Sequence, residues 1–282
     1  MPGTLFVVAT PIGNLEDITA RALRVLREVT LIAAEDTRRT AHLLARYAIS
    51  TPTTSLHEHN ERKKAAALIA RLQRGESVAL VSDAGTPTIS DPGHWLIRVA
   101  IDAGIRVEPI PGPSAALAAL AASGIASDTF TFLGFPPTRS NDRNRWLEEL
   151  RDAGRPVIFF EAPHRIVETL RQIHSLVGNC QIAVARELTK AHEELVRGPI
   201  LDVLASLPNP RGEFTVIVEI GHKTNYDIAR EASGSDLAAE LGEITEHGGL
   251  SRRQAINALA RRHRVPPNQV YAAIERVRKS AK

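Results

Sequence analysis

The chain has 282 residues, of which 43% are hydrophobic and 24% charged, and its formal net charge is +3. This composition is typical of a soluble globular protein, and the length predicts two domains with a small third unit. No apolar run reaches the roughly 20 residues that span a bilayer, and the chain opens on a predicted strand rather than a signal sequence. The single cysteine, Cys180, excludes an internal disulfide and a four-thiolate metal site, so we expect a cytoplasmic protein.

Residues 1–113 predict an α/β domain, because short apolar strands alternate with segments of helical periodicity. The first expected helix lies near residues 19–28, and the second ends near residue 46. A third, capped by Asn60, extends to residue 72, and a fourth lies near residues 95–103. The expected strands cover residues 5–9, 31–34, 53–56, 78–81 and 107–110.

Residues 114–222 predict a second α/β domain, which begins with an Ala-rich helix over residues 115–122. Further helices are expected over residues 143–153, 166–177 and 200–207, and strands over residues 130–135, 157–160, 182–185, 194–196 and 214–220. Two of these strands follow each other closely, which favours a mixed sheet over a fully parallel one. An acidic linker with one helix near residues 237–246 is expected over residues 223–249.

Residues 250–282 predict a separate basic helical module, with nine Lys or Arg residues against the single acid Glu275. Ser251 and Gln254 match a capping box at the start of its first helix. A Pro-Pro turn at residues 266–267 separates this helix from a second one, as in helix-turn-helix units. The charge favours a polyanionic partner such as RNA. A solvated tail in an Arg-rich protein is the alternative.

Residues 82–93 form the most informative loop, SDAGTPTISDPG, which follows the apolar run at residues 78–81 and precedes a helix. That order places the loop at the carboxyl end of a strand, where open α/β sheets bind ligands. Two Gly and two Pro residues direct main-chain groups outward, so the loop is suited to hold a small polar ligand. An ordinary surface turn is the alternative.

Six other polar loops also follow predicted strands, which a parallel topology would bring to one rim. They lie at residues 10–14, 35–38, 57–60, 111–114, 160–165 and 186–190. Neither a G-x-G-x-x-G fingerprint nor a Walker A sequence is present, which argues against a dinucleotide dehydrogenase or a P-loop enzyme.

Eight motifs, in order and covering about residues 3–220, resemble the ribosomal small-subunit methyltransferase I group of the tetrapyrrole-methylase superfamily. They are VATPIGNL, AEDTR, SDAGTPTISDPG, PGPSA, FLGFPP, FFEAPHR, ARELTK and GEFTVIV. The resemblance implies two α/β domains with a cleft between them for the methyl donor S-adenosylmethionine. It also implies 2′-O-methylation of a decoding-centre cytidine in 16S rRNA of the 30S subunit, and a homodimer.

Main-chain groups in two loops are suited to the polar ends of S-adenosylmethionine, and an apolar segment at residues 133–135 is suited to flank its adenosine. We therefore expect the donor to contact Pro11, Gly13, Ala84, Gly85, Thr86, Pro87, Ser114, Ala115, Leu133 and Gly134.

A ribose hydroxyl is a weak nucleophile, so a positioned base would accelerate the transfer by roughly 10²–10⁴-fold. The candidate catalytic residues are Asp36, Glu161, Glu187 and Lys190. Each could instead belong to a structural ion pair, and Glu187 and Lys190 could pair with each other.

Guanidinium groups bind phosphate bidentately, which makes Arg residues the main candidates for RNA contact, although some could brace Asp36 or Glu161 instead. The expected substrate-binding residues are Arg38, His57, Asn60, Arg165, Arg186, Arg252, Arg253, Arg261 and Arg262. His57 and His59 are expected to share a strand face, but no third ligand accompanies them, so we expect no metal.

Two other functions remain open. A methylase of a small tetrapyrrole precursor would have the same fold, since fold alone does not select a substrate. A non-catalytic ribosome-assembly factor would use the basic module and would not bind S-adenosylmethionine.

Overall fold

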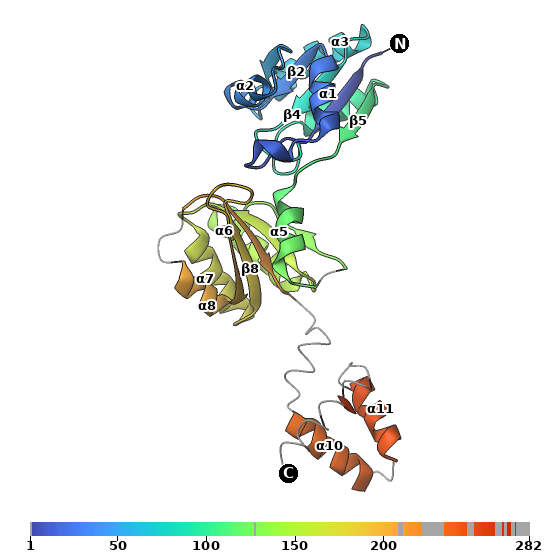
Figure 1. The fold of residues 1–282 in the computed structure, drawn as a ribbon, viewed down its shortest axis with the longest axis vertical. Helices are drawn as coiled ribbons and strands as arrows, with labels where there is room; N and C mark the ends of the chain where they lie inside the picture. Colours follow the sequence, from blue (N-terminus) through green and yellow to red (C-terminus); the bar gives the residue numbers. More distant parts are fainter. Residues whose placement is uncertain are drawn as a thin grey trace. The chain divides into compact units, whose positions relative to one another are not determined.

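The computed structural model describes residues 2–126, 128–207, 211–220, 234–246 and 251–262, together with Pro267, Val270, Tyr271 and Ile274. The chain divides into two compact units, Met1–Ile220 and Gly221–Lys282. The first unit contains two separate five-stranded sheets, one in each half (Figure 1). The predicted domain boundaries at residues 113 and 222 stay predictions.

The first sheet is fully parallel and has the strand order β3-β2-β4-β1-β5. Its strands are β1 (Thr4–Val8), β2 (Leu31–Ala34), β3 (Thr53–Ser55), β4 (Val78–Val81) and β5 (Arg106–Ile110). The elements between them are η1 (Leu15–Asp17), α1 (Ala20–Glu28), α2 (Thr37–Arg46), α3 (Glu61–Gln73) and α4 (His94–Asp102).

Helices cover both faces of this sheet, which is why every residue of β2 and β4 is buried. Neighbouring strand residues enter opposite cores because side chains alternate across a strand. Val81 packs in the core that α1 and α2 cover, whereas Leu80 packs in the core under α3 and α4. The strands predicted over residues 31–34 and 78–81 are therefore confirmed.

The second sheet is mixed and has the order β6-β7-β10-β8-β9, in which only the β6–β7 pair is parallel. Its strands are β6 (Thr131–Phe132), β7 (Val157–Glu161), β8 (Gln181–Arg186), β9 (Glu194–Pro199) and β10 (Phe214–Val218). One face packs against α5 (Ala115–Ser123). The other packs against α6 (Ser140–Asp152), α7 (Ile166–Val177) and α8 (Ile200–Ser206). The α/β fold class and the mixed second sheet are confirmed.

Three local predictions were wrong. Strand β6 covers two residues rather than the predicted 130–135, because the chain turns at Gly134 with a φ of 60°. Asn60 precedes α3, but its side chain makes no capping hydrogen bond to that helix and instead accepts one of 3.0 Å from the His57 backbone. His57 and His59 lie in the turn after β3 and not on a strand.

The second unit contains α10 (Gly234–Glu246) and α11 (Arg252–Arg262), which pack together through apolar side chains. Their core includes Leu241, Leu259, Val270 and Ile274. The predicted capping box is confirmed, since the Ser251 backbone donates to Gln254 at 3.0 Å and the Gln254 backbone donates to the Ser251 hydroxyl at 3.4 Å. The rest of the predicted linker and tail lies outside the described residues.

No helix in the described ranges is both long and apolar enough to cross a lipid bilayer.

Candidate functional site

The loop at residues 82–93 is fastened to the loop after β1. Thr10 and Gly85 form an isolated antiparallel bridge, with backbone hydrogen bonds of 2.8 and 3.0 Å, and the Thr10 hydroxyl donates to the Ser82 carbonyl. The Thr86 hydroxyl lies 3.5 Å from the Pro113 carbonyl, which follows β5. The carboxyl ends of three neighbouring strands therefore supply one contiguous group of loops, as the parallel topology predicted.

The backbone of this loop is unusual, because two residues that are not glycine adopt left-handed conformations. Thr88 has a φ of 73° and Ser90 a φ of 67°, and Gly85 and Gly93 are also left-handed. Left-handed residues other than glycine are uncommon in proteins, and they are concentrated at active and ligand-binding sites. A Cβ on Gly93 would lie 2.7 Å from Leu80, so the loop is also packed closely against β4. The predicted irregular backbone is therefore present.

Four acidic side chains meet where β2 and β4 end. The Asp83 backbone donates to Glu35 at 3.2 Å, and the Asp36 backbone donates to Asp83 at 3.0 Å. Burial, together with the neighbouring Glu35 and Asp83 carboxylates, raises the pKa of Asp91 to about 6, against a hydrogen bond from Ser82 that lowers it. Burial also raises the pKa of Glu35. The predicted site residues did not include Glu35, Asp83 or Asp91, although all three stand within the AEDTR and SDAGTPTISDPG motifs.

Asp36 is ion-paired with Arg38. The guanidinium donates to both carboxylate oxygens, at 3.1 and 2.8 Å, and the Arg38 backbone donates to Asp36 as an N-cap of α2. These hydrogen bonds lower the pKa of Asp36 to about 2. Asp36 is therefore ionised at neutral pH and is a weak base, while the Arg38 side chain is 87% exposed and available to a further anion.

Glu161 is buried at the end of β7 and holds that strand to α7. It accepts hydrogen bonds from the Thr169 hydroxyl at 2.6 Å and from the Ala162 backbone at 2.9 Å, and Arg165 lies 3.4 Å away. Arg165 also donates to the carbonyls of Pro136 and Pro137. The sequence allowed either a catalytic role for Glu161 or a structural pairing with an Arg residue. The contacts of Glu161 are those of the structural pairing.

Lys190 lies between two carboxylates, at 2.9 Å from Glu187 and 2.9 Å from Glu213. Burial lowers the pKa of Lys190, but the hydrogen bonds to Glu213 and Glu187 outweigh it and leave this pKa raised. A hydrogen bond from the Glu213 backbone, helped by Lys190, lowers the pKa of Glu187. Lys190 is thus a cation at neutral pH and acts as a donor rather than as a base.

The Lys190 loop contacts the loop after β1, although the two belong to different sheets. The Asn14 backbone donates to the Thr189 hydroxyl at 2.9 Å, and a Cβ on Gly13 would lie only 2.6 Å from Lys190. An open cavity of about 550 Å³ lies at this junction. It is lined by Gly13, Asn14, Leu15, Glu16, Arg46, Thr189, Lys190 and Ala191.

Gly134 provides a second contact between the two halves, since a Cβ there would lie 3.3 Å from the Ser90 hydroxyl. Of the predicted donor residues, Gly85 and Thr86 lie in the residue 82–93 loop and contact Thr10 and Pro113, respectively. Gly134 lies close to Ser90 of the same loop. Gly13 joins the Lys190 side of the same junction.

The other predicted substrate residues do not gather at one place. His57 and Asn60 contact each other after the edge strand β3, and Arg186 pairs with Glu194 at 3.3 Å. Arg252 and Arg253 belong to the second unit, and the side chains of Arg261 and Arg262 lie outside the described residues.

Residues 4–204 match the family of tetrapyrrole (corrin/porphyrin) methylases. The chain belongs to the tetrapyrrole methylase family. Solved structures of similar fold agree, all at low sequence identity. Diphthine synthase has a TM-score of 0.62 at 14% identity, over 77% of this chain and 90% of that one. Uroporphyrin-III C-methyltransferase from Thermus thermophilus, complexed with S-adenyl homocysteine, has a TM-score of 0.56 at 16% identity, over 77% and 97%.

Within the tetrapyrrole methylases, the chain is much more similar to curated relatives named ribosomal RNA small subunit methyltransferase I. The relative from Xylella fastidiosa is 49% identical and is aligned over 86% of this chain and 90% of its own length. The relative from Synechocystis is 44% identical over 95% of this chain and 96% of its own length. The relative from Pseudomonas aeruginosa is 52% identical over 77% of this chain and 78% of its own length. The resemblance seen in the motifs is confirmed.

Proposed function

We propose that this tetrapyrrole methylase transfers the methyl group of S-adenosylmethionine to a cytidine 2′-hydroxyl of 16S rRNA in the small ribosomal subunit. The observation that carries the proposal is the 44% identity to the Synechocystis methyltransferase, which extends over 95% of the chain and hence beyond the two sheets. The basic residues 250–282 support an RNA substrate. We further propose that the protein acts in the cytoplasm as a homodimer.

The residues present fit a sulfonium donor. The left-handed backbone of the residue 82–93 loop directs peptide groups toward a ligand, and the carboxylates of Glu35 and Asp83 give this rim a negative potential that favours a cation. S-adenosylmethionine supplies an electrophilic methyl group on a sulfonium cation. The donor would be held through main-chain contacts by Gly85, Pro113 and Gly134, the last of which lies next to Ser90.

In the transfer, the ribose oxygen bonds to the methyl carbon as the carbon–sulfur bond breaks, and the hydroxyl proton leaves. Alignment and exclusion of water carry much of the rate of such a displacement. The low pKa of Asp36 and of Glu187 suits these residues to hold cations in place. Asp91 belongs to the residue 82–93 loop that would hold the donor, and its pKa is raised to about 6, so it is better matched than Asp36 or Glu187 to accept the proton.

The proposal is tested by incubating the protein and labelled S-adenosylmethionine with 30S subunits that lack the modification, and then mapping the labelled nucleoside. Naked 16S rRNA and a uroporphyrinogen are tried in parallel. We expect label on the 2′-oxygen of one cytidine in the 30S reaction. Label on a base would overturn the ribose assignment, and label on the tetrapyrrole alone would overturn the RNA assignment. Absence of heat on titration with S-adenosylmethionine would identify a non-catalytic assembly factor.

A further inference from the structure

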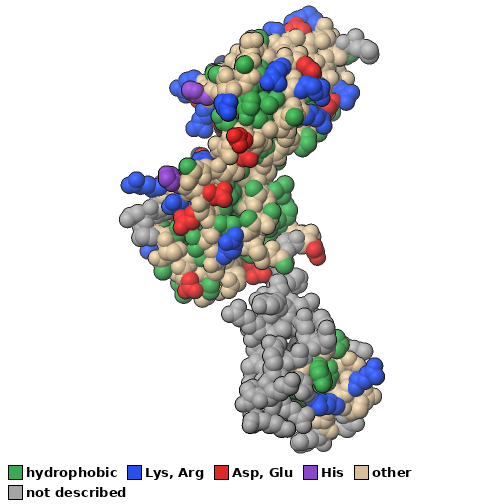
Figure 2. Space-filling view, in the orientation of Figure 1, with side chains coloured by type: hydrophobic (Ala, Val, Ile, Leu, Met, Phe, Trp, Pro, Cys, Tyr) green, Lys and Arg blue, Asp and Glu red, His purple; other side chains and the backbone are tan. Residues whose placement is uncertain are grey.

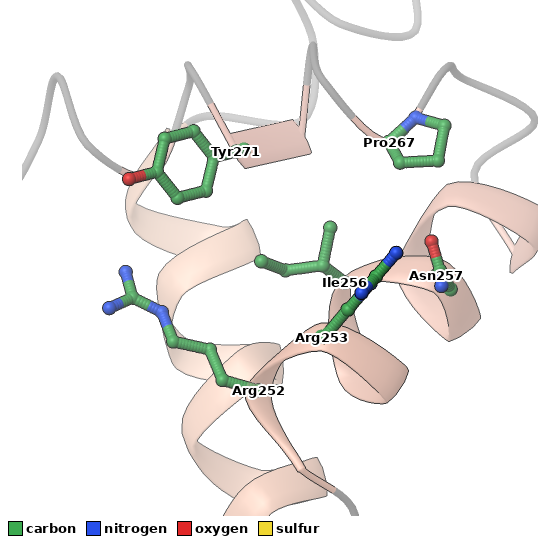
Figure 3. Close-up of a pocket in the computed structure, with 6 residues that line it drawn as sticks. All are labelled: Arg252, Arg253, Ile256, Asn257, Pro267 and Tyr271. Carbon is green, nitrogen blue, oxygen red and sulfur yellow. The ribbon is translucent and has the colours of Figure 1, made fainter.

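The second unit contains a pocket that no catalytic step uses. Its volume is about 650 Å³, within the range of roughly 300–1,000 Å³ that is typical of small-ligand sites. The pocket lies between the first turns of α11 and the described helical residues Pro267 and Tyr271 (Figure 3). Its lining residues are Arg252, Arg253, Ile256, Asn257, Pro267 and Tyr271.

The pocket combines an apolar floor with an exposed aromatic ring. Ile256 is buried in the core of the second unit, whereas Tyr271 is 51% exposed although it neighbours the buried Val270. The guanidinium carbon of Arg252 lies 5.9 Å from the centroid of the Tyr271 ring. Aromatic rings and guanidinium planes beside an apolar surface are the groups on which unpaired bases stack.

The charge of α11 points to an anion at the same place. Arg252 and Arg253 occupy its first turn, which contains no acidic residue. Cations at a helix N-terminus oppose the helix dipole. The side chains and the dipole thus concentrate positive potential at the rim of the pocket, and a bound phosphate would relieve it. Figure 2 shows basic side chains next to hydrophobic ones on the visible described surface of this unit.

We propose that this pocket binds one unpaired nucleotide of single-stranded RNA. The base packs on Tyr271 above Ile256, the amide of Asn257 hydrogen-bonds the base edge, and Arg253 holds the adjoining phosphate. The proposal rests on the RNA substrate of the proposed function and adds the site and the single-stranded class of ligand. The pocket is then an anchor that recognises an unpaired segment of rRNA, separate from the methyl-transfer site.

The test is the affinity of the full-length protein for a fluorescein-labelled single-stranded oligocytidylate, measured by fluorescence anisotropy. Stacking of one base contributes about 1–3 kcal/mol, so Tyr271→Ala should weaken binding by roughly 5- to 150-fold, and Tyr271→Phe should keep it. Tyr271→Leu preserves apolar bulk without a ring plane and should lose affinity like Tyr271→Ala, which separates stacking from packing. Melting temperatures report whether each variant is folded.

Arg253→Ala should lower the slope of log affinity against log salt by about 1, since one phosphate contact is lost. Arg24→Ala is the matched control, because it removes an equal charge from an exposed residue of α1 and should leave the slope unchanged. Equal oligonucleotide affinity of the wild type, Tyr271→Ala and Tyr271→Leu would overturn the proposal. If these variants lost affinity for 30S subunits but not for the oligonucleotide, the pocket would bind a ribosomal protein instead of RNA.

The outcome is independent of methyl transfer. If the protein methylates no RNA but Tyr271 is still required for oligocytidylate binding, the proposed function fails and the nucleotide pocket stands. If 30S subunits are methylated and RNA affinity does not depend on Tyr271, the pocket proposal fails alone. Binding of duplex RNA that equals single-strand binding and is insensitive to Tyr271 would assign the basic surface to double-helical RNA instead, and would also overturn the proposal.

Discussion

The backbone N–H of Asn14 donates a hydrogen bond of 2.9 Å to the hydroxyl of Thr189, a residue 175 positions later in the chain. This contact joins the loop after β1 to the loop that carries Lys190. Thr189 itself has a left-handed φ of 65°, as does Glu187 with 50°, so the second loop is strained where the first loop meets it. The space between the two loops is the cavity at the junction of the sheets.

The first prediction concerns Gly13, which allows this close approach. An added Cβ would lie 2.6 Å from Lys190 and 2.7 Å from the Thr189 hydroxyl, so Gly13→Ala must push the loops apart. A displacement of about 1 Å can cost on the order of 10²-fold in rate, so we expect such a loss of methyl transfer in a folded protein. Steady-state assays on 30S subunits measure it. Gly242→Ala is the control, since nothing lies within 4 Å there, and its activity should be unchanged.

The second prediction separates backbone strain from donor binding at Gly85. Gly85 has a φ of 77° and Gly104, after α4, has a φ of 69°. Alanine at either position should therefore cost about 1–2 kcal/mol of folding stability. Only Gly85→Ala should also weaken S-adenosylmethionine binding, because Gly85 is bridged to Thr10 in the proposed donor loops. Calorimetry and thermal melts measure both effects. Equal donor affinity of the two variants would place the donor elsewhere.

The third prediction is a pH dependence of stability that comes from Asp91. Its pKa is raised to about 6 in the folded protein, from an ordinary value of 3.8. Between these pH values the folded state holds a proton that the unfolded state has lost, so stability falls as pH rises through this window and levels off above pH 6. Asp91→Asn should flatten the profile in urea unfolding series. Asp102→Asn, at an exposed carboxylate on α4, should leave it unchanged.

The fourth prediction assigns Lys190 a cationic role. The pKa of Lys190 is raised, so Lys190 stays protonated at neutral pH. The rate of methyl transfer should therefore not rise with pH through deprotonation of Lys190. Lys190→Met leaves Glu187 and Glu213 without their shared partner and should reduce transfer at least tenfold, whereas Lys190→Arg should restore part of it. The measurement is the rate of methyl transfer by the wild type and both Lys190 variants over a range of pH. If Lys190→Met showed wild-type turnover, Lys190 would have no part in the reaction.

The sequence predicted those parts of the fold that depend on local patterns. The apolar runs of β2 and β4 and the capping box at Ser251 are local signals, and the structure contains each of them. Strand β6 was predicted too long because the apolar residues around Gly134 resemble a strand, whereas the left-handed φ of that glycine is invisible in composition.

The candidate site was less predictable, because its decisive contacts join distant residues. The pairing of Asp36 with Arg38, two positions apart in the AEDTR motif, is a local contact that the sequence had offered as an alternative. The other contacts are not local. Burial and the charge of Glu35 together raise the pKa of Asp91, and the close approach to Gly13 comes from Lys190. No spacing rule relates such pairs, since their meeting depends on how the sheets and loops pack.

The last prediction concerns the second unit as a whole. Residues 221–282 are a compact unit of their own, with an apolar core that includes Leu241 and Leu259. Removing residues 250–282 should leave S-adenosylmethionine affinity intact, because the proposed donor loops lie before residue 220. The loss of nine Lys or Arg residues should raise KM for 30S subunits and flatten its salt dependence, since fewer counterions are released on binding. Enzyme kinetics at several salt concentrations, with sedimentation to follow the oligomeric state, provide the measurement. A truncated protein that binds 30S subunits with unaltered affinity and salt slope, yet melts earlier or changes its oligomeric state, would make the module a structural support rather than an RNA anchor.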